Sequence, residues 1–206
     1  MIAEVEGNKK DKRKRKIPDY LIREWIDGKP LYYKGYKEVL NKKKTLEDII
    51  GSSALQAYIV TYLVMLIAKK NLDSKYHILS NEAGLYLDNK NNLAADILIY
   101  DPKIMTPDKI SAHYANVPAK VQIEVDITIE LEELKDYQYV EKKINKLHQF
   151  GTEKVMWVLT NIKKVMVAVP EQPWQTYDWN NDIELLDGVI FNIGAYLKEK
   201  GVTLPE

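Results

Sequence analysis

The sequence of 206 residues contains no cysteine, which excludes disulfide scaffolds, zinc–thiolate modules and cysteine nucleophiles. It also lacks the glycine-rich loops that hold phosphates in nucleotide-binding proteins, and it has no G-x-S-x-G element of a serine hydrolase. The three histidines, His77, His113 and His148, are too widely separated to match the spacing of a metal site. These absences leave the carboxylates as the main candidates for chemistry.

No apolar stretch is long enough to cross a membrane. The most apolar one, residues 54–68, is shorter than the roughly 20 residues that span a bilayer, and it predicts a buried helix. The first ten residues lack the apolar core of a signal peptide. We therefore expect a cytoplasmic protein with no membrane contact, and the absence of cysteine agrees with a reducing compartment.

Positive and negative charges balance at 30 each, but they are unevenly distributed. Residues 1–16 contain seven basic and three acidic residues, so this segment carries +4 and the remainder of the chain −4. We interpret residues 1–16 as a flexible basic arm and residues 17–206 as a single domain. The arm is either a solvated tail or a clamp in which residues 9–16 contact a phosphate backbone, and the charge run alone favours the tail.

Hydrophobic periodicity and turn residues predict a mixed α/β domain. Helices are expected from Pro18 to the residue before Gly28, over 53–70, over 131–151 and near the C-terminus. Strands over 75–88 and 94–101 should form a hairpin, with Gly84 at a bend in the first strand. Residues 102–118 are expected to form a loop. Further strands are expected at 120–127, 154–160, 164–169, 174–179 and 183–193.

Carboxylates occur on three of the predicted strands. Side chains alternate along residues 121–127, which places Glu124 and Asp126 on one face, about 6.6 Å apart. Asp96 opens an otherwise apolar strand, and the hairpin can bring Glu82 close to it. Clustered carboxylates repel one another, and a divalent cation that prefers oxygen ligands relieves this repulsion. The alternative is a solvent-facing acidic surface, and alternation alone does not distinguish the two.

The helix predicted over 131–151 carries a lysine that faces the sheet. Its apolar stripe consists of Val140, Ile144 and Leu147. At 100° per residue, Lys143 lies about 60° from Val140, on the flank of this stripe, whereas Lys142 and Lys146 point towards solvent. Such a lysine either covers the edge of the core with its aliphatic part or, beside carboxylates, orients a water and stabilises charge on a phosphate.

These stretches resemble the PD-(D/E)XK nuclease superfamily and, within it, the Uma-type restriction endonucleases. The resemblance lies in an acid that opens the second strand of a hairpin (AADILIYD), a third strand with a glutamate (QIEVD), and a helix whose lysine precedes a glycine (KINKLHQFGTEKVMW). The segment YLIREWIDGKPLYYKG is similar to the opening segment of the family. The resemblance covers about residues 17–200.

The resemblance implies a restriction-endonuclease-like fold, with a mixed β-sheet core flanked by helices. It matches Asp96 to the aspartate of the motif, Glu124 to the glutamate and Lys143 to the lysine. It further implies that Asp96, Glu124 and the backbone carbonyl of Val125 hold one or two Mg²⁺ ions, for which Mn²⁺ can substitute. Glu82 matches an additional acidic position of the family, and Lys143 would position the attacking water.

The activity that the resemblance implies is Mg²⁺-dependent hydrolysis of DNA by an endonuclease, with DNA as partner and a homodimer to cut both strands. The sequence departs from the motif at Ala95, where the family has proline, at Asp126, where it commonly has lysine, and at Leu147, where tyrosine is common. These departures leave open a degenerate nuclease fold that only binds nucleic acid or a protein. A metal-free module that docks a protein through aromatic residues is a third possibility.

Overall fold

The structure is a computed structural model, and it describes residues 16–127, 129–130 and 136–204. The predicted basic arm lies outside the described residues except for Lys16. The predicted helix over 131–151 is described from residue 136 onwards.

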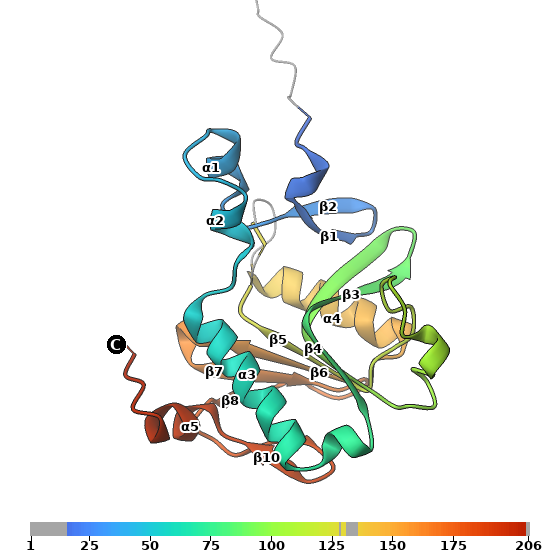
Figure 1. Cartoon of the computed structure of the whole chain (residues 1–206), viewed down its shortest axis with the longest axis vertical. Helices are drawn as coiled ribbons and strands as arrows, with labels where there is room; N and C mark the ends of the chain where they lie inside the picture. Colours follow the sequence, from blue (N-terminus) through green and yellow to red (C-terminus); the bar gives the residue numbers. More distant parts are fainter. Residues whose placement is uncertain (1–15, 128, 131–135, 205–206) are drawn as a thin grey trace, which may run out of the picture.

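Eight strands of the described chain form one central sheet, with the order β2-β1-β4-β5-β6-β7-β8 and with β3 paired to β4 (Figure 1). Every pairing is antiparallel except that of β5 with β6. The strands are β1 (Ile22–Ile26), β2 (Lys29–Tyr32), β3 (His77–Asp88), β4 (Asn91–Tyr100), β5 (Val121–Val125), β6 (Lys154–Leu159), β7 (Lys164–Ala168) and β8 (Gln175–Asp178). A separate ribbon pairs β9 (Ile183–Leu186) with β10 (Val189–Phe191).

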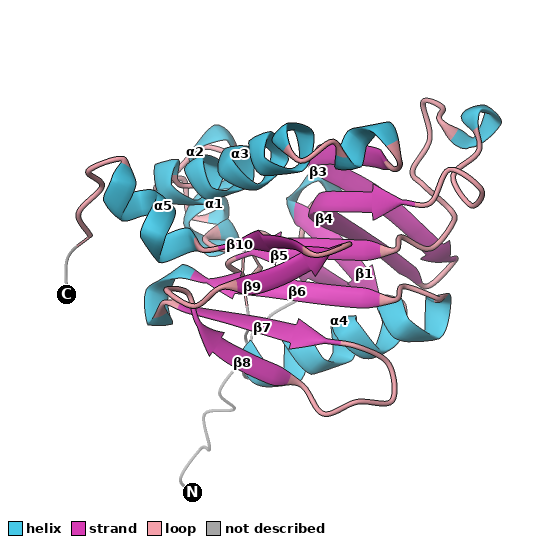
Figure 2. Cartoon of the chain, turned by 90° about the horizontal axis from the view of Figure 1, so that it is seen from below, coloured by secondary structure: helices cyan, strands magenta, loops and turns pink. Residues whose placement is uncertain are grey.

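Two long helices lie on opposite faces of the sheet, α3 (Ala54–Lys69) on one and α4 (Asp136–Phe150) on the other (Figure 2). The parallel strands β5 and β6 require a crossover connection, and α4 provides it. The shorter α-helices of the described residues are α1 (Tyr36–Leu40), α2 (Glu47–Ile50) and α5 (Ile193–Glu199). The 3₁₀ turns in the same residues are η1 (Asp19–Leu21), η2 (Leu72–Ser74), η3 (Pro107–Lys109) and η4 (Thr160–Ile162). The architecture confirms the predicted mixed α/β sheet flanked by helices.

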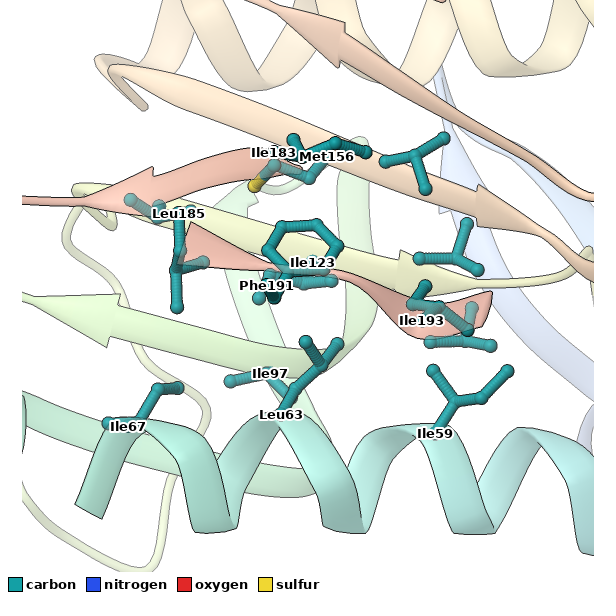
Figure 3. Packing of buried hydrophobic residues seen from close by; sticks show 14 of the residues in the cluster. Ile59, Leu63, Ile67, Ile97, Ile123, Met156, Ile183, Leu185, Phe191 and Ile193 are labelled. Carbon is teal, nitrogen blue, oxygen red and sulfur yellow. The ribbon is translucent and has the colours of Figure 1, made fainter. Parts of the chain in front are cut away.

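The helix α3 is the expected buried helix. The Ser53 hydroxyl accepts the Gln56 backbone N–H at 3.1 Å, which caps its first turn. Its buried face packs on the sheet and on the β9–β10 ribbon, where Ile59, Leu63 and Ile67 contact a shared core (Figure 3). Within the described chain, no helix is long and apolar enough to span a bilayer.

The predicted hairpin, the strands β5 to β8 and the helix α4 are confirmed, but the helix expected after Pro18 is wrong. Residues 22–26 form the strand β1, which pairs with β2 and β4. Its side chains alternate, so that Glu24 and Ile26 are buried while Arg23 and Trp25 lie on the other face. Sheet pairing on both sides outweighs the weak helical pattern of this short segment.

The bend expected at Gly84 is also wrong. The register of β3 against β4 shifts between Ser80 and Ala83, and Asn81 and Glu82 both adopt left-handed backbone angles, with φ of 68° and 56°. This β-bulge redirects the strand. Gly84 has another role, because a Cβ there would overlap ring atoms of Tyr114.

Truncation of Leu63, which is 0% exposed in the core under α3, should destabilise the fold. We expect Leu63→Ala to lower the free energy of unfolding by about 2–5 kcal/mol, because it leaves a cavity in a packed core. Met65 on the same helix is 46% exposed, and Met65→Ala should change stability by less than about 0.5 kcal/mol. Urea denaturation followed by circular dichroism measures both, and equal losses would contradict the packing described for α3.

Candidate functional site

The candidate site lies where one edge of β4 opens. β3 occupies the other edge along its whole length. On this edge, Asn92 pairs with Trp25 of β1, and Ile97–Ile99 pair with β5. Residues 93–96 therefore face a gap between β1 and β5, and their backbone groups need partners from side chains.

Side chains from β1 and α4 fill this gap. The backbone N–H of Ala94 donates to Glu24 Oε1 at 3.1 Å, and its carbonyl accepts from Lys143 Nζ at 2.8 Å. The Glu24 carboxylate accepts a second hydrogen bond from the Tyr139 hydroxyl at 2.8 Å. Glu24 and Lys143 thus replace the missing ladder bonds of β4.

Lys143 joins two carboxylates inside the protein. Its Nζ lies 2.7 Å from Glu24 Oε1 and 3.0 Å from Glu124 Oε1, and its side chain is 2% exposed. The Gln122 amide also donates to Glu124 Oε1, at 2.6 Å. The orientation that the helical wheel predicts for Lys143 is confirmed, because the lysine points from α4 into the sheet.

Asp96 and Glu124 meet from neighbouring strands. The antiparallel register pairs Ile97 with Ile123, and one further step would place Asp96 opposite Glu124. Here the Asp96 carboxylate takes the place of a backbone carbonyl in the β-ladder, because its Oδ2 accepts the Val125 backbone N–H at 2.7 Å. The Gln56 amide of α3 lies 3.4 Å from Asp96 Oδ1.

Burial sets the electrostatics of the site. It raises the pKa of Glu124 to about 7, against the opposing effect of Lys143, and it raises the pKa of Asp96 against the Val125 N–H bond. Burial alone would lower the pKa of Lys143, but Glu124 and Glu24 outweigh it and raise that pKa. Two carboxylates contact the Lys143 ammonium group, and Asp96 adds a third carboxylate on the neighbouring strand. When all three are ionised they outnumber the ammonium group, which favours an additional cation.

Asp126 does not continue the row of acids expected on β5. Its φ of 63° turns the chain out of the strand. One carboxylate oxygen accepts the Thr160 backbone N–H at 2.7 Å, and both accept its hydroxyl. This expectation from strand alternation is wrong, because β5 ends at Val125 and Asp126 fastens the chain to the end of β6.

Glu82 lies near Asp96 but is already paired. Glu82 and Asp96 line a pocket of about 310 Å³ between α3 and the bulge of β3. Glu82 Oε2 is 2.6 Å from a guanidinium nitrogen of Arg23. A role as metal ligand would require Glu82 to leave this ion pair.

Three residues of the site were not among the sequence candidates: Glu24, Gln56 and Tyr139. Gln56 had a detectable signal, because it lies on the same buried stripe of α3 as Ile59 and Leu63. A polar side chain in such a stripe needs a partner. Glu24 and Tyr139 had no comparable signal, because their partners come from remote parts of the chain.

The residues present fit a divalent cation through two carboxylates. Among the described residues, no group of three or more His, Asp and Glu side chains is arranged to hold a metal ion. Mg²⁺ is usually bound through one or two carboxylates together with waters and substrate phosphates. Asp96 and Glu124 supply two such groups. Of the two Glu124 carboxylate oxygens, only Oε1 has polar partners among the described residues, which leaves Oε2 available.

Comparison with known proteins identifies a fold but no family. No protein-family model matches the sequence, and no curated protein matches it. Among solved structures, the chain is similar to a "putative nuclease belonging to DUF820" from Anabaena variabilis. The TM-score is 0.61 over 85% of this chain and 89% of the other, at 15% sequence identity. The mixed α/β fold expected from the sequence is therefore shared with that nuclease-like protein.

Loss of the buried lysine should destabilise the protein far more than loss of an exposed one. We expect Lys143→Met to lower the free energy of unfolding by about 3–5 kcal/mol, because Glu24 and Glu124 then remain buried without a counterion. Adding Glu24→Gln should recover part of this loss, since it removes one of the two unpaired charges. Chemical denaturation of the single and double variants measures the coupling.

Lys146 provides the matched control, because it forms an ion pair of similar length, 2.6 Å to Asp27, at the surface. Lys146→Met should cost less than about 1 kcal/mol. If Lys143→Met were as mild as Lys146→Met, the buried cluster would not carry the stability assigned to it.

Proposed function

We propose that the protein is a Mg²⁺-dependent endonuclease that hydrolyses phosphodiester bonds of DNA. The observation that carries the proposal is the meeting of Asp96, Glu124 and Lys143 in the gap beside β4. These residues come from two adjacent strands and the following helix, in the order that the PD-(D/E)XK resemblance requires. The fold likeness to a protein described as a nuclease supports the proposal, and we also propose that the chain is of the Uma type.

In this proposal Asp96 and Glu124 hold Mg²⁺, with the Val125 carbonyl as a further ligand. Bound Mg²⁺ would lower the pKa of a water and offset negative charge on the phosphate. Both carboxylates have raised pKa values because they are buried, so a cation would favour their ionised forms. Mn²⁺ would serve in the same position, since both ions accept oxygen ligands.

Lys143 is best assigned as a positioning residue. Its ammonium group has three N–H bonds, and the structure supplies three acceptors: Glu24, Glu124 and the Ala94 carbonyl. It therefore holds Glu124 in place and has no donor left for a water. This differs from the role in water activation that the resemblance implies for the lysine.

The same observation favours one alternative, a catalytically degenerate protein that only binds nucleic acid or a protein partner. A lysine that is 1% exposed and already fully bonded contributes no donor to the reaction. Both hypotheses retain the fold, so the fold does not distinguish them. A cleavage assay does, because only the first proposal predicts hydrolysis of DNA.

Replacement of Asp96 tests the proposal directly. We expect Asp96→Asn to reduce Mg²⁺-dependent nicking of supercoiled plasmid at least about 100-fold, because it removes a charged contact to the reaction centre. Calorimetric titration with Mg²⁺ and Mn²⁺ should show weaker binding in the variant, and chelation with EDTA should abolish nicking by the unaltered protein. Unchanged nicking by purified Asp96→Asn would falsify the assignment.

Glu153→Gln is a suitable control for this experiment, because Glu153 is a surface carboxylate with a 62% exposed side chain that pairs with Lys120. It should leave both nicking and cation binding unchanged. Cation binding without nicking in the unaltered protein would support the degenerate alternative.

The proposed partners are DNA and a second copy of the chain, in the cytoplasm. We expect removal of residues 1–16 to weaken duplex binding and to flatten its dependence on salt, since each phosphate contact contributes about 0.9 to the slope of log K against log salt. A variant with the seven basic residues of this segment changed to glutamine keeps the chain length. It should show the same weaker duplex binding and flatter salt dependence as the truncated protein. Filter binding at several salt concentrations measures the slope, and an unchanged slope would make the arm a solvated tail.

A further inference from the structure

A second pocket, of about 340 Å³, opens beside the gap in the sheet. The pocket forms because successive side chains of β1 lie on opposite faces of the sheet. Glu24 points into the Lys143 cluster, whereas Arg23 and Trp25 lie on the other face of β1 and line this pocket together with Tyr33, Tyr114 and Asn92. Three aromatic side chains, one guanidinium and one amide therefore surround a small space.

The floor and one wall of this pocket leave room for a flat group. Gly84 and Ala94 also line it, and they face each other in the register of β3 and β4, so neither presents a large side chain. Tyr114 packs directly over Gly84, where no Cβ would fit. Tyr114 is 59% exposed and Trp25 is 38% exposed, which makes both rings available for stacking.

The charges of the pocket favour a neutral ligand over a phosphate. The Arg23 guanidinium is neutralised by Glu82 at 2.6 Å and lies 5.4 Å from the centre of the Tyr33 ring. Asp19 also lines the pocket and adds negative charge, and it lies 3.9 Å from the Lys16 ammonium group. An uncharged ring with polar edges suits this lining, since aromatic faces stack on it and Asn92 offers a hydrogen-bonding amide.

The pocket adjoins the proposed reaction centre. Ala94 lines it and is the residue whose backbone binds Glu24 and Lys143. Glu82 lines both this pocket and the one that contains Asp96. A nucleic acid strand with its phosphate at Asp96 and Glu124 would thus bring a neighbouring nucleotide to Trp25.

We propose that this pocket binds an unpaired nucleobase of the substrate strand. This inference rests on the proposed nuclease function and specifies its substrate as DNA with at least one unpaired base beside the bond to be cut. Bases within a duplex are stacked and paired, so a base reaches the pocket only from single-stranded DNA or after leaving the helix. Trp25 and Tyr114 would contact the base by stacking, and the Arg23–Glu82 pair would shape the pocket.

Fluorescence anisotropy in EDTA tests the proposal without any cleavage. The probes are a labelled single strand of about 12 nucleotides, within the site sizes known for single-strand binding, and the corresponding blunt duplex. We expect the single strand to bind more tightly. Trp25→Ala and Tyr114→Ala should each weaken its binding roughly 5- to 100-fold, as expected for one base–aromatic stack, while Trp25→Phe should retain most of the affinity.

Tyr137→Ala is the matched control, because Tyr137 is 60% exposed but lines a different cavity of about 1070 Å³. It should leave single-strand binding unchanged, and thermal unfolding by circular dichroism should show that all variants are folded. Unaltered single-strand affinity in folded Trp25→Ala, or a loss in Tyr137→Ala alone, would overturn the proposal.

Plasmid nicking separates this inference from the proposed function. Single-strand binding that depends on Trp25, without any nicking, would uphold the pocket and remove the nuclease assignment. Nicking by the unaltered protein, with single-strand binding that is insensitive to Trp25→Ala, would overturn the pocket and uphold the nuclease.

Discussion

The ion pairs of Lys143 with Glu24 and Glu124 are the interaction on which the rest of the structure depends. They lie in the interior, where each charge alone would carry a large desolvation cost. Because Glu24 comes from β1, Glu124 from β5 and Lys143 from α4, satisfying these charges fixes three elements around the open edge of β4. The same contacts supply the Ala94 backbone with the partners that a neighbouring strand would otherwise provide. The gap beside Asp96 is therefore stabilised by Lys143 and Glu124, the residues proposed to act with it.

Much of this architecture could be predicted because the relevant patterns are local. The alternation of β3 to β7 and the 3.6-residue stripe of α4 mark these elements, and the stripe also identifies Lys143 as the inward lysine. The strand β1 could not be predicted in this way. One of its two buried positions is occupied by Glu24 and only the other, Ile26, is apolar, so the hydrophobic pattern that would reveal a strand is too short. The reason for burying a carboxylate there is a lysine that lies 119 residues away.

In the candidate site, too, the features set by local patterns could be predicted and those set by remote contacts could not. Asp96 and Glu124 are recognisable because an acid within an apolar strand is unusual, and strand order brings them together. Asp126 was misplaced because alternation holds only while the backbone stays extended, and its positive φ ends the strand. Glu82 was placed close to Asp96 correctly, but its pairing with Arg23 depends on a bulge whose two left-handed residues are not glycine. A fold shared at 15% sequence identity does not predict such local side-chain contacts.

The separation of 119 residues between Glu24 and Lys143 also has a consequence during synthesis of the chain. The N-terminal strands leave the ribosome first, and at that stage Glu24 has no cation to bury with, so it stays in water. The loop between the two residues must close before either charge leaves solvent, and such long-range contacts form slowly. The candidate site therefore cannot form in a nascent or truncated chain that lacks α4, and its ion pairs are complete only in the full fold.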